Sequence, residues 1–207
     1  MKAKTLNRNF LLLIIGQASS MFGTVLLKFT VSLLILDLTS SAALFGTITA
    51  ISYLPPVFLS PIGGIIADRN NKRNLMIALD SLYGIIAVLL VLSLSFSHVL
   101  ILITIIMVGL AVVSSFETPV VQSSIPLIQE KDSLIQSNAI VSQINMLANL
   151  IVPLLAGLLY SAVGKAYLQD VRIIFLGCAI CFFSAAILEA FIKIPQIALP
   201  PISNPLH

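Results

Sequence analysis

The sequence predicts an all-α membrane protein with six transmembrane helices. Hydrophobic residues make up 58% of the 207 residues and charged residues only 9%, whereas a soluble domain has about 25% charged residues. The mean hydropathy is +1.09. The apolar residues form long continuous runs of the length that a helix needs to cross a bilayer. They do not alternate with polar residues, as the short strands of a membrane barrel do.

Six such runs follow one another, with short polar breaks between them. The first run is too long for a cleaved signal peptide, so we expect a retained helix. The stretch "DLTSS" at 37–41 supplies side chains that can cap the next helix. The longest break, 118–137, contains Pro119 and Pro126. The expected spans are residues 10–36, 42–66, 74–96, 99–116, 138–163 and 171–194, followed by a proline-rich tail at 195–207.

The basic residues predict the orientation of these spans. With the N-terminus inside, only Lys165 and Arg172 fall outside, and Lys28 lies within the first span. This asymmetry follows the positive-inside rule. We therefore expect a multi-pass protein of the cell (plasma) membrane with both termini in the cytoplasm. The bases on the expected cytoplasmic side are Lys2, Lys4, Arg8, Arg69, Lys72, Arg73, Lys131 and Lys193.

Several other functions lack support in the sequence. The formal charge of +3 resides in short loops, with no basic face of interleaved aromatics, so we expect no nucleic-acid partner. No phosphate-binding loop and no metal-ligand spacing occur, so we expect no enzyme, metal or cofactor. Cys178 and Cys181 lie in an apolar run, where a thiolate is disfavoured, and we interpret them as small lipophilic side chains.

The loop "GGIIADRNNKR" at 63–73 is the densest group of charges. Gly64 and Asp68 are four residues apart and share one helix face, where a glycine lets a neighbouring backbone approach. Asp68 can accept hydrogen bonds from a helix N-terminus or a base. We therefore expect a latch on the cytoplasmic side, formed by Gly64, Asp68, Arg69, Lys72 and Arg73.

The order Gly64-x-x-x-Asp68-Arg69-x-x-Lys72-Arg73 resembles the loop signature of the major facilitator superfamily, in its usual place between spans two and three. Asn71 replaces the loop glycine, and asparagine tolerates a left-handed backbone better than most residues. The stretches "NRNFLLLIIGQ", "LDLTSSA" and "IPLI…SNAIVSQ" look like the drug-exporter branch that includes macrolide-efflux-type proteins.

This resemblance implies the N-terminal half of a transporter in which two six-helix bundles rock about a central site. Three departures stand out. The family often has an arginine in span four that is linked to proton coupling, and residues 99–116 contain none. The exporter motif of span five lacks two glycines at 152–157. The chain is also long enough for only one of the two six-helix bundles. The sequence therefore does not predict proton antiport by the family's usual residues.

Polar residues inside the spans are the candidate substrate contacts. Gln17, Thr24 and Lys28 lie along one face of the first span, and Ser114 lies in the fourth. Such a stripe faces a cavity or another helix, and Lys28 has snorkelling to the outer interface as its main alternative.

The fifth span carries a second polar stripe that includes Asn145 and Asn149. Binding between helices is at least as good an explanation for it as substrate contact. Pro153 and Gly157 would let this helix bend.

Three acidic residues lie near span ends, namely Asp80, Glu117 and Glu189. We expect them to form structural or gating pairs with Arg69, Arg73 or Lys193 at the cytoplasmic face, and a proton-carrying role is the alternative.

The function predicted from these features is secondary active transport, with the chain exporting a small amphipathic compound or drug as a transporter or its N-terminal half. The expected partners are the lipid bilayer, a small-molecule substrate and a second six-helix bundle, supplied by a missing C-terminal half or another copy. The alternative is a truncated or non-transporting membrane subunit that needs a second bundle.

Overall fold

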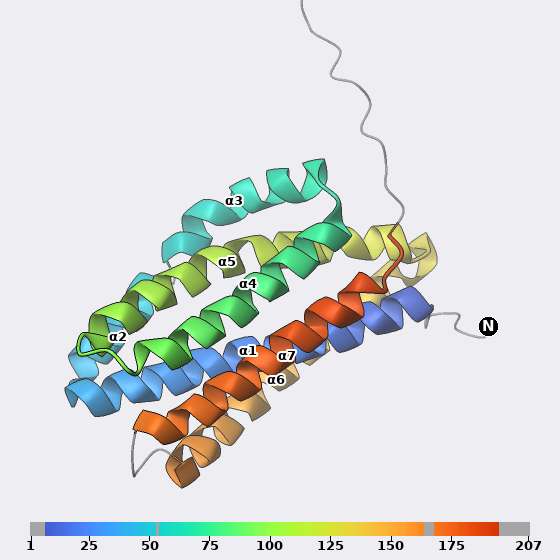
Figure 1. The fold of residues 1–207 in the computed structure, drawn as a ribbon. Coiled ribbons are helices and arrows are strands. Elements are labelled where there is room, and N and C mark those ends of the chain that lie inside the picture. The colour runs from blue at the N-terminus through green and yellow to red at the C-terminus, as the bar shows by residue number, and fades with distance from the viewer. Residues whose placement is uncertain (1–6, 53, 164–167, 195–207) are drawn as a thin grey trace, which may run out of the picture.

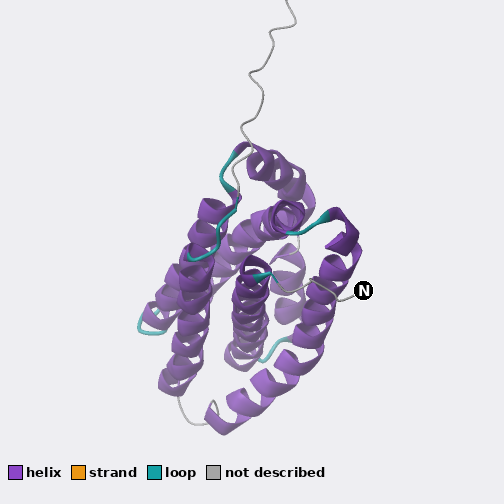
Figure 2. Ribbon diagram, turned by 90° about the vertical axis from the view of Figure 1, so that its right-hand side faces the viewer, coloured by secondary structure: helices purple, strands orange, loops and turns teal. Residues whose placement is uncertain are grey.

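The computed structural model describes residues 7–52, 54–163 and 168–194, and this part of the chain is a bundle of helices (Figure 1). Figure 2 shows only helices and loops among these residues. Lys2, Lys4, Lys165 and the tail at 195–207 lie outside the described residues. The helices are α1 (Arg8–Thr39), α2 (Ala42–Ser52), α3 (Leu54–Arg69), α4 (Lys72–Ser93), α5 (Val99–Ile128), a 3-10 turn η1 (Lys131–Ser133), α6 (Leu134–Val163) and α7 (Leu168–Ala190).

Within the described residues, six helical segments are long and apolar enough to cross a membrane, with α2 and α3 together forming the second. This confirms the expected fold class. Helices satisfy their own backbone hydrogen bonds, which is what hydrocarbon demands of a spanning segment. Large apolar side chains also cover the outside of the bundle, among them Phe58, Leu150 and Ile180, as on a surface that faces lipid.

The bundle is built around α1, α4 and α7, with α5 packed on α4. Tyr83 of α4 stacks on Phe182 of α7, with ring centroids 5.0 Å apart. Gly23 of α1 makes room for the same ring, because a Cβ there would lie 3.0 Å from Phe182 Cε1. Small residues thus bring these helices together, as is usual where lipid provides no hydrophobic drive for association.

Two helices lie at opposite edges of the bundle. In Figure 1, α3 lies along one edge against α5, and α6 along the other against α1. The approach of α3 to α5 is close at Gly63, where an added Cβ would be 2.8 Å from the backbone oxygen of Ser115. Each edge helix therefore depends mainly on one neighbour.

The fourth span is longer than its sequence predicts. We expected it to end at 116 and a loop to follow over 118–137, but α5 continues to Ile128. Pro119 and Pro126 lie inside the helix. Prolines are tolerated in membrane helices because neighbouring groups satisfy the freed backbone carbonyls. Glu117 is therefore placed well inside the span rather than at its end.

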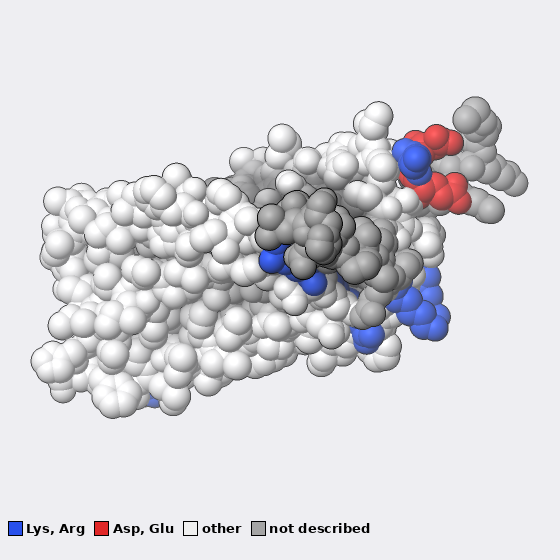
Figure 3. Space-filling model, turned by 90° about the horizontal axis from the view of Figure 1, so that it is seen from above, with Lys and Arg blue, Asp and Glu red and all other residues white. Residues whose placement is uncertain are grey.

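One end of the bundle collects most of the described basic residues, and we refer to it as the basic end: Arg8, Arg69, Lys72, Arg73, Lys131 and Lys193. Asn9 Nδ2 donates to the backbone oxygen of Lys193 at 3.0 Å, which joins the start of α1 to the segment after α7. Figure 3 shows most of the visible charged atoms towards one end of the molecule. At the opposite end, Tyr160 donates to Asp37 Oδ2 at 2.7 Å.

Candidate functional site

A pocket of about 100 Å³ opens between α1, α5 and α6, and we refer to it as the polar pocket. Its apolar wall includes Met21 and Ile125. A mixed lining of this kind is typical of small-molecule sites, where a few polar groups fix orientation. The polar lining residues are Gln17, Glu117, Thr118, Gln122, Asn138, Ser142 and Asn145.

The α6 wall of the pocket follows from helical spacing. Asn138, Ser142 and Asn145 are four and three residues apart, which places them on one face of the helix. Asn138 and Ser142 are exposed, and Asn145 is half-buried with no hydrogen-bond partner for Oδ1 among the described residues. An exposed amide stripe is out of place against hydrocarbon, so this face of α6 needs an aqueous or protein neighbour.

Glu117 stands at the back of the pocket and accepts two hydrogen bonds. Gln17 Nε2 of α1 donates to Oε1 at 3.2 Å. The Tyr83 hydroxyl of α4 donates to Oε2 at 2.9 Å. Both carboxylate oxygens thus have a neutral donor, which suits an ionised group that is half-buried.

Behind Glu117 lie two more acidic side chains, Asp80 of α4 and Glu189 of α7. They are only 3% and 2% exposed. Ser20 Oγ donates to Asp80 Oδ1 at 2.6 Å. Asp80 and Glu189 line the same small cavity. We refer to Asp80, Glu117 and Glu189 together as the carboxyl cluster.

A second, smaller cavity of about 10 Å³ is lined by all three members of the carboxyl cluster and by Gln17. That volume is close to what a single water molecule needs. Gln17 and Glu117 line both the small cavity and the polar pocket. Val121 lines both as well, so these three side chains lie between the open pocket and the buried carboxyls.

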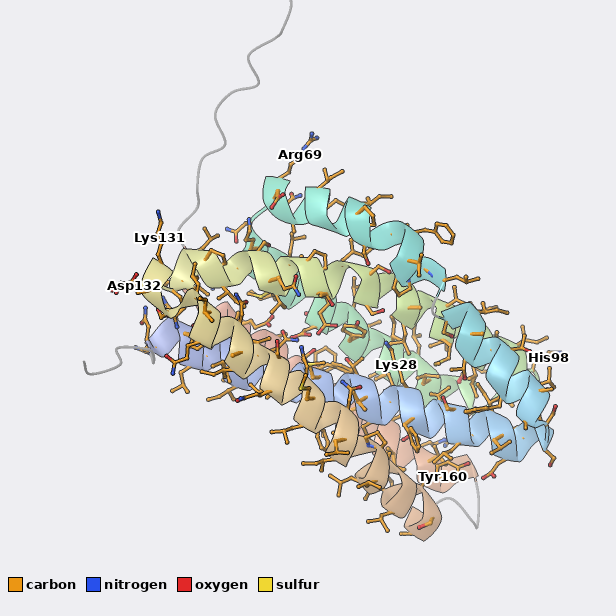
Figure 4. The ribbon with its side chains drawn as sticks, turned by 180° about the vertical axis from the view of Figure 1, so that it is seen from behind. Lys28, Arg69, His98, Lys131, Asp132 and Tyr160 are labelled. Atoms are coloured by element: carbon orange, nitrogen blue, oxygen red, sulfur yellow. The ribbon has the colours of Figure 1, made fainter. Side chains whose placement is uncertain are left out.

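The expected pairing of these acids with Arg69, Arg73 or Lys193 is wrong for the described residues. Arg73 Nη2 donates to the backbone oxygen of Ala190, and Arg69 projects away from the bundle at the end of α3 (Figure 4). The acids instead turn inward. Glu117 lies inside the bundle because α5 continues past it to Ile128. For Glu189 the reason is the space beside Gly16, where a Cβ would lie 3.3 Å from Glu189 Cγ.

The other predicted cavity residues of the first and fourth spans are less closely grouped. Thr24 is buried, and its hydroxyl has no partner among the described residues. Lys28 is half-buried and projects from the middle of α1 towards the bundle interior (Figure 4). Ser114 donates to the backbone oxygen of Ala111 in its own helix at 2.8 Å. None of the three lines the polar pocket, whereas Gln17 does.

In the fifth span, Asn145 lines the pocket and Asn149 does not. Asn149 is exposed, and its Nδ2 donates to the backbone oxygen of Asn145 at 2.8 Å. The α6 helix continues through Pro153, and Gly157 has open space around its Cα. A bend at these two residues stays a prediction.

The charged loop differs from expectation at two residues. Gly64 has nothing within 4 Å of an added Cβ, and the close approach occurs at Gly63 instead. Asn71 has φ −66° and caps α4, with Oδ1 accepting from Asn74 N at 3.3 Å, so its backbone is extended rather than left-handed. Among the other predicted latch residues, Lys72 Nζ donates to the Ala67 oxygen at 3.1 Å, and Asp68 and Arg69 are exposed.

The sequence did not predict two features of the site. One is the set of α5 side chains that line the pocket, and the other is that Asp80, Glu117 and Glu189 lie together. Thr118 and Gln122 fell in the expected loop, and Glu117 was assigned to a span end. The signal that could have found them is their spacing, since positions 118 and 122 are four apart and therefore share a helix face.

Six apolar helices around a polar pocket define a multi-pass membrane protein. The sequence profile of the Major Facilitator Superfamily matches residues 13–204. The chain therefore belongs to this superfamily of transporters, as the loop signature at 64–73 predicts.

Two relatives are similar along much of the chain. Macrolide efflux protein A of Streptococcus pyogenes is 22% identical over 183 residues, which cover 88% of this chain and 44% of the relative. The Staphyloferrin A transporter of Staphylococcus aureus is 31% identical over 150 residues, 72% of this chain and 36% of the relative. The chain thus spans less than half the length of these curated relatives. No solved structure gives a significant match.

Proposed function

We propose that the chain is one six-helix bundle of a secondary active transporter that exports a small amphipathic compound through the polar pocket. The observation that carries the proposal is this pocket itself, with polar groups from α1, α5 and α6 inside an otherwise apolar bundle. Likeness to macrolide efflux protein A favours export of a drug-like compound.

The size of the pocket supports the need for a second bundle. Its volume of about 100 Å³ is below the ~300–1,000 Å³ of sites that enclose a drug-sized ligand. The exposed amides of α6 then face the second bundle across a shared cavity. That bundle is supplied by a C-terminal half or by another copy, and the two bundles rock about the site they share.

The proposal includes an orientation and a latch. The basic end faces the cytoplasm of the cell membrane, in keeping with the positive-inside rule, so both ends of the bundle's chain lie there. Asp68 and Arg69 are exposed at that end, where they are free to bind a second bundle. Gly64 has open space beside it, which a helix of that bundle can fill.

Uptake and loss of labelled compounds by cells that produce the chain test the proposal. The probes are a macrolide and staphyloferrin A, because the two relatives differ in what their names say they carry. We expect faster loss of one probe than from cells lacking the chain. Ser142→Leu, which fills the pocket, should abolish the difference, and Ser161→Leu on the same helix outside the pocket should preserve it. Equal loss with and without the chain would sink the proposal.

A further inference from the structure

Lys28 is the one basic residue that lies deep inside a span among the described residues. It is half-buried, and it projects towards the interior of the bundle (Figure 4). Its Nζ makes no hydrogen bond or ion pair with a described residue. A charge in this position is costly in a membrane and marks a functional site whose partner has to be named. Lys28 therefore needs an anionic partner.

Snorkelling to the outer interface does not account for Lys28. The helix α1 continues from Lys28 to Thr39, a distance of about 16 Å along the helix axis, which is longer than a lysine side chain. Helical side chains also tilt towards the N-terminus of their own helix. For Lys28 this direction is away from Thr39 and towards Thr24, so its ammonium group stays inside the span.

The face of α1 that carries Lys28 is also the face that lines the polar pocket. Gln17 and Met21 line the pocket. At about 100° per residue, Thr24 and Lys28 lie within about 20° of Gln17 around the helix. A compound that moves from the polar pocket along α1, away from the basic end, therefore passes Thr24 and then Lys28.

Thr24 has an unused hydroxyl one helical turn from Lys28. It is 8% exposed, and its Oγ1 has no partner among the described residues. Hydroxyls inside helices often donate to the carbonyl four residues earlier, as Ser32 does to the Lys28 oxygen at 2.8 Å. The other buried hydroxyl of α1 without a described partner, that of Thr30, lies on the opposite side of the helix from Gln17. Only Thr24 therefore combines an unused hydroxyl with the pocket face of α1.

We propose that Lys28 and Thr24 bind a carboxylate of the transported compound, while the neutral polar groups of the compound lie in the polar pocket. This inference rests on the proposed function and names its substrate class, an amphipathic anion. Lys28 supplies one positive charge and Thr24 one hydroxyl donor. This set suits a singly charged carboxylate better than a phosphate group, which has a second charge and a third oxygen to satisfy.

The position of Glu117 orients the compound. Glu117 is the one charged residue among the described residues that line the polar pocket, and an ionised Glu117 repels an anion. Gln17 donates to it at 3.2 Å, whereas Lys28 lies about 16 Å further along α1 from Gln17. The two opposite charges are therefore separated along α1, and the carboxylate is held at the Lys28 end of this face.

Acetylation of Lys28 by acetic anhydride tests the site without requiring transport. Membrane vesicles from cells that produce the chain are treated with the reagent, and mass spectrometry measures the acetylation of each lysine. We expect phenylbutyrate to slow acetylation of Lys28 about tenfold, as for a charge-assisted hydrogen bond, and its neutral amide, phenylbutyramide, to have no effect. Lys131, exposed at the basic end, is the internal control and should react equally throughout. Equal protection by the two compounds, or a Lys28 that stays unmodified without either, overturns the proposal.

Export of labelled phenylbutyrate from the same cells separates this proposal from the proposed function. Lys28→Gln should slow its export about tenfold, whereas Lys28→Arg keeps the charge and should keep most of the export. The matched control Lys131→Gln should change nothing. Export that is unaffected by Lys28→Gln, or that occurs for phenylbutyramide and a macrolide but not for phenylbutyrate, overturns the carboxylate site and leaves the proposed function intact. Protection of Lys28 from acetylation without export of any compound overturns the proposed function and retains the carboxylate site.

Discussion

The helices at the centre and at the edges of the bundle are all apolar enough to cross a membrane, but they are packed quite differently. In the apolar stretch of α1, 50% of the residues are buried, and in that of α7 44% are buried. The corresponding share is 17% for α6 and 6% for the segment 42–69, which holds α2 and α3. The centre consists of α1, α4 and α7, and the edges of α2, α3 and α6. Apolar character alone therefore takes a helix into the membrane but does not decide what it packs against.

Two features account for the tighter centre. Glycines on α1 face aromatic and acidic side chains of α7, as at Gly16 and Gly23. Hydrogen bonds also cross between helices there, from Ser20 to Asp80 and from Ser19 to the Cys181 oxygen, while the edge helix α6 has the bond from Tyr160 to Asp37 at its end. On α6, by contrast, Leu150, Leu154 and Leu158 are each 67% exposed. The edge helices are thus free to take a second neighbour, and each prediction below tests one part of this contrast.

The largest effect is expected where an edge helix has its one close contact. Gly63→Ala should destabilise the bundle by about 3 kcal/mol, because overpacking against a fixed group costs ~1–3 kcal/mol or more and the obstacle is the Ser115 carbonyl, 2.8 Å from the new Cβ. The measurement is the midpoint of unfolding in mixed micelles. Gly64→Ala is the control, since nothing lies within 4 Å of its Cβ. Equal stability of the two variants would contradict the close packing of α3 on α5.

The next effect concerns the lysine in the centre. Lys28→Met should stabilise the bundle by about 2 kcal/mol, since a lysine at mid-helix costs ~2.5–3.5 kcal/mol and partial snorkelling relieves some of that. If Lys28 has the cavity role expected from sequence, the same change should lower transport. A gain in stability with unchanged transport would show that Lys28 has no role in the transport cavity. A loss of stability would show that Lys28 has a structural partner.

The fold was predictable because it depends on quantities that a sequence displays. Run length and hydropathy determine the number of spans, and these came out correctly. The end of the fourth span did not, because Pro119 and Pro126 stop helices in water and are tolerated in lipid. Because of this error, Glu117 was expected at the end of a span although it lies inside it, and the α5 residues that line the pocket were not predicted.

The site was only half predictable, since it depends on what lies opposite each residue. Gln17 and Asn145 were found because a polar side chain in an apolar run is conspicuous by itself. The inward turn of Glu189 depends on Gly16, far away in sequence. Gly63 and Gly64 differ by one residue, a rotation of about 100° around the helix, and only a neighbouring helix decides which of them is the close contact.

A smaller effect tests whether the edge at the basic end binds a second bundle. Asp68→Asn should lower transport about tenfold, or roughly 1.4 kcal/mol of coupling, while membrane insertion and stability stay normal. The reason is that Asp68 is exposed in the described bundle, so that the change affects only a contact made elsewhere. Asp132→Asn, at the same end outside the loop, is the control. Unchanged transport in Asp68→Asn would end the latch hypothesis.

The smallest effect compares one hydrogen bond in the centre with one at an edge. Ser20→Ala should destabilise the bundle by about 1 kcal/mol, because interhelical hydrogen bonds in membranes contribute ~0.6–2 kcal/mol and Asp80 loses its 2.6 Å donor. Ser161→Ala on α6 removes a hydroxyl that bonds only to Leu158 of its own helix, at 2.9 Å, and should change stability little. The comparison uses reversible unfolding in the same micelles. If both changes cost the same, hydrogen bonds across helices do not distinguish the centre from the edges, and the small residues alone account for the tighter packing.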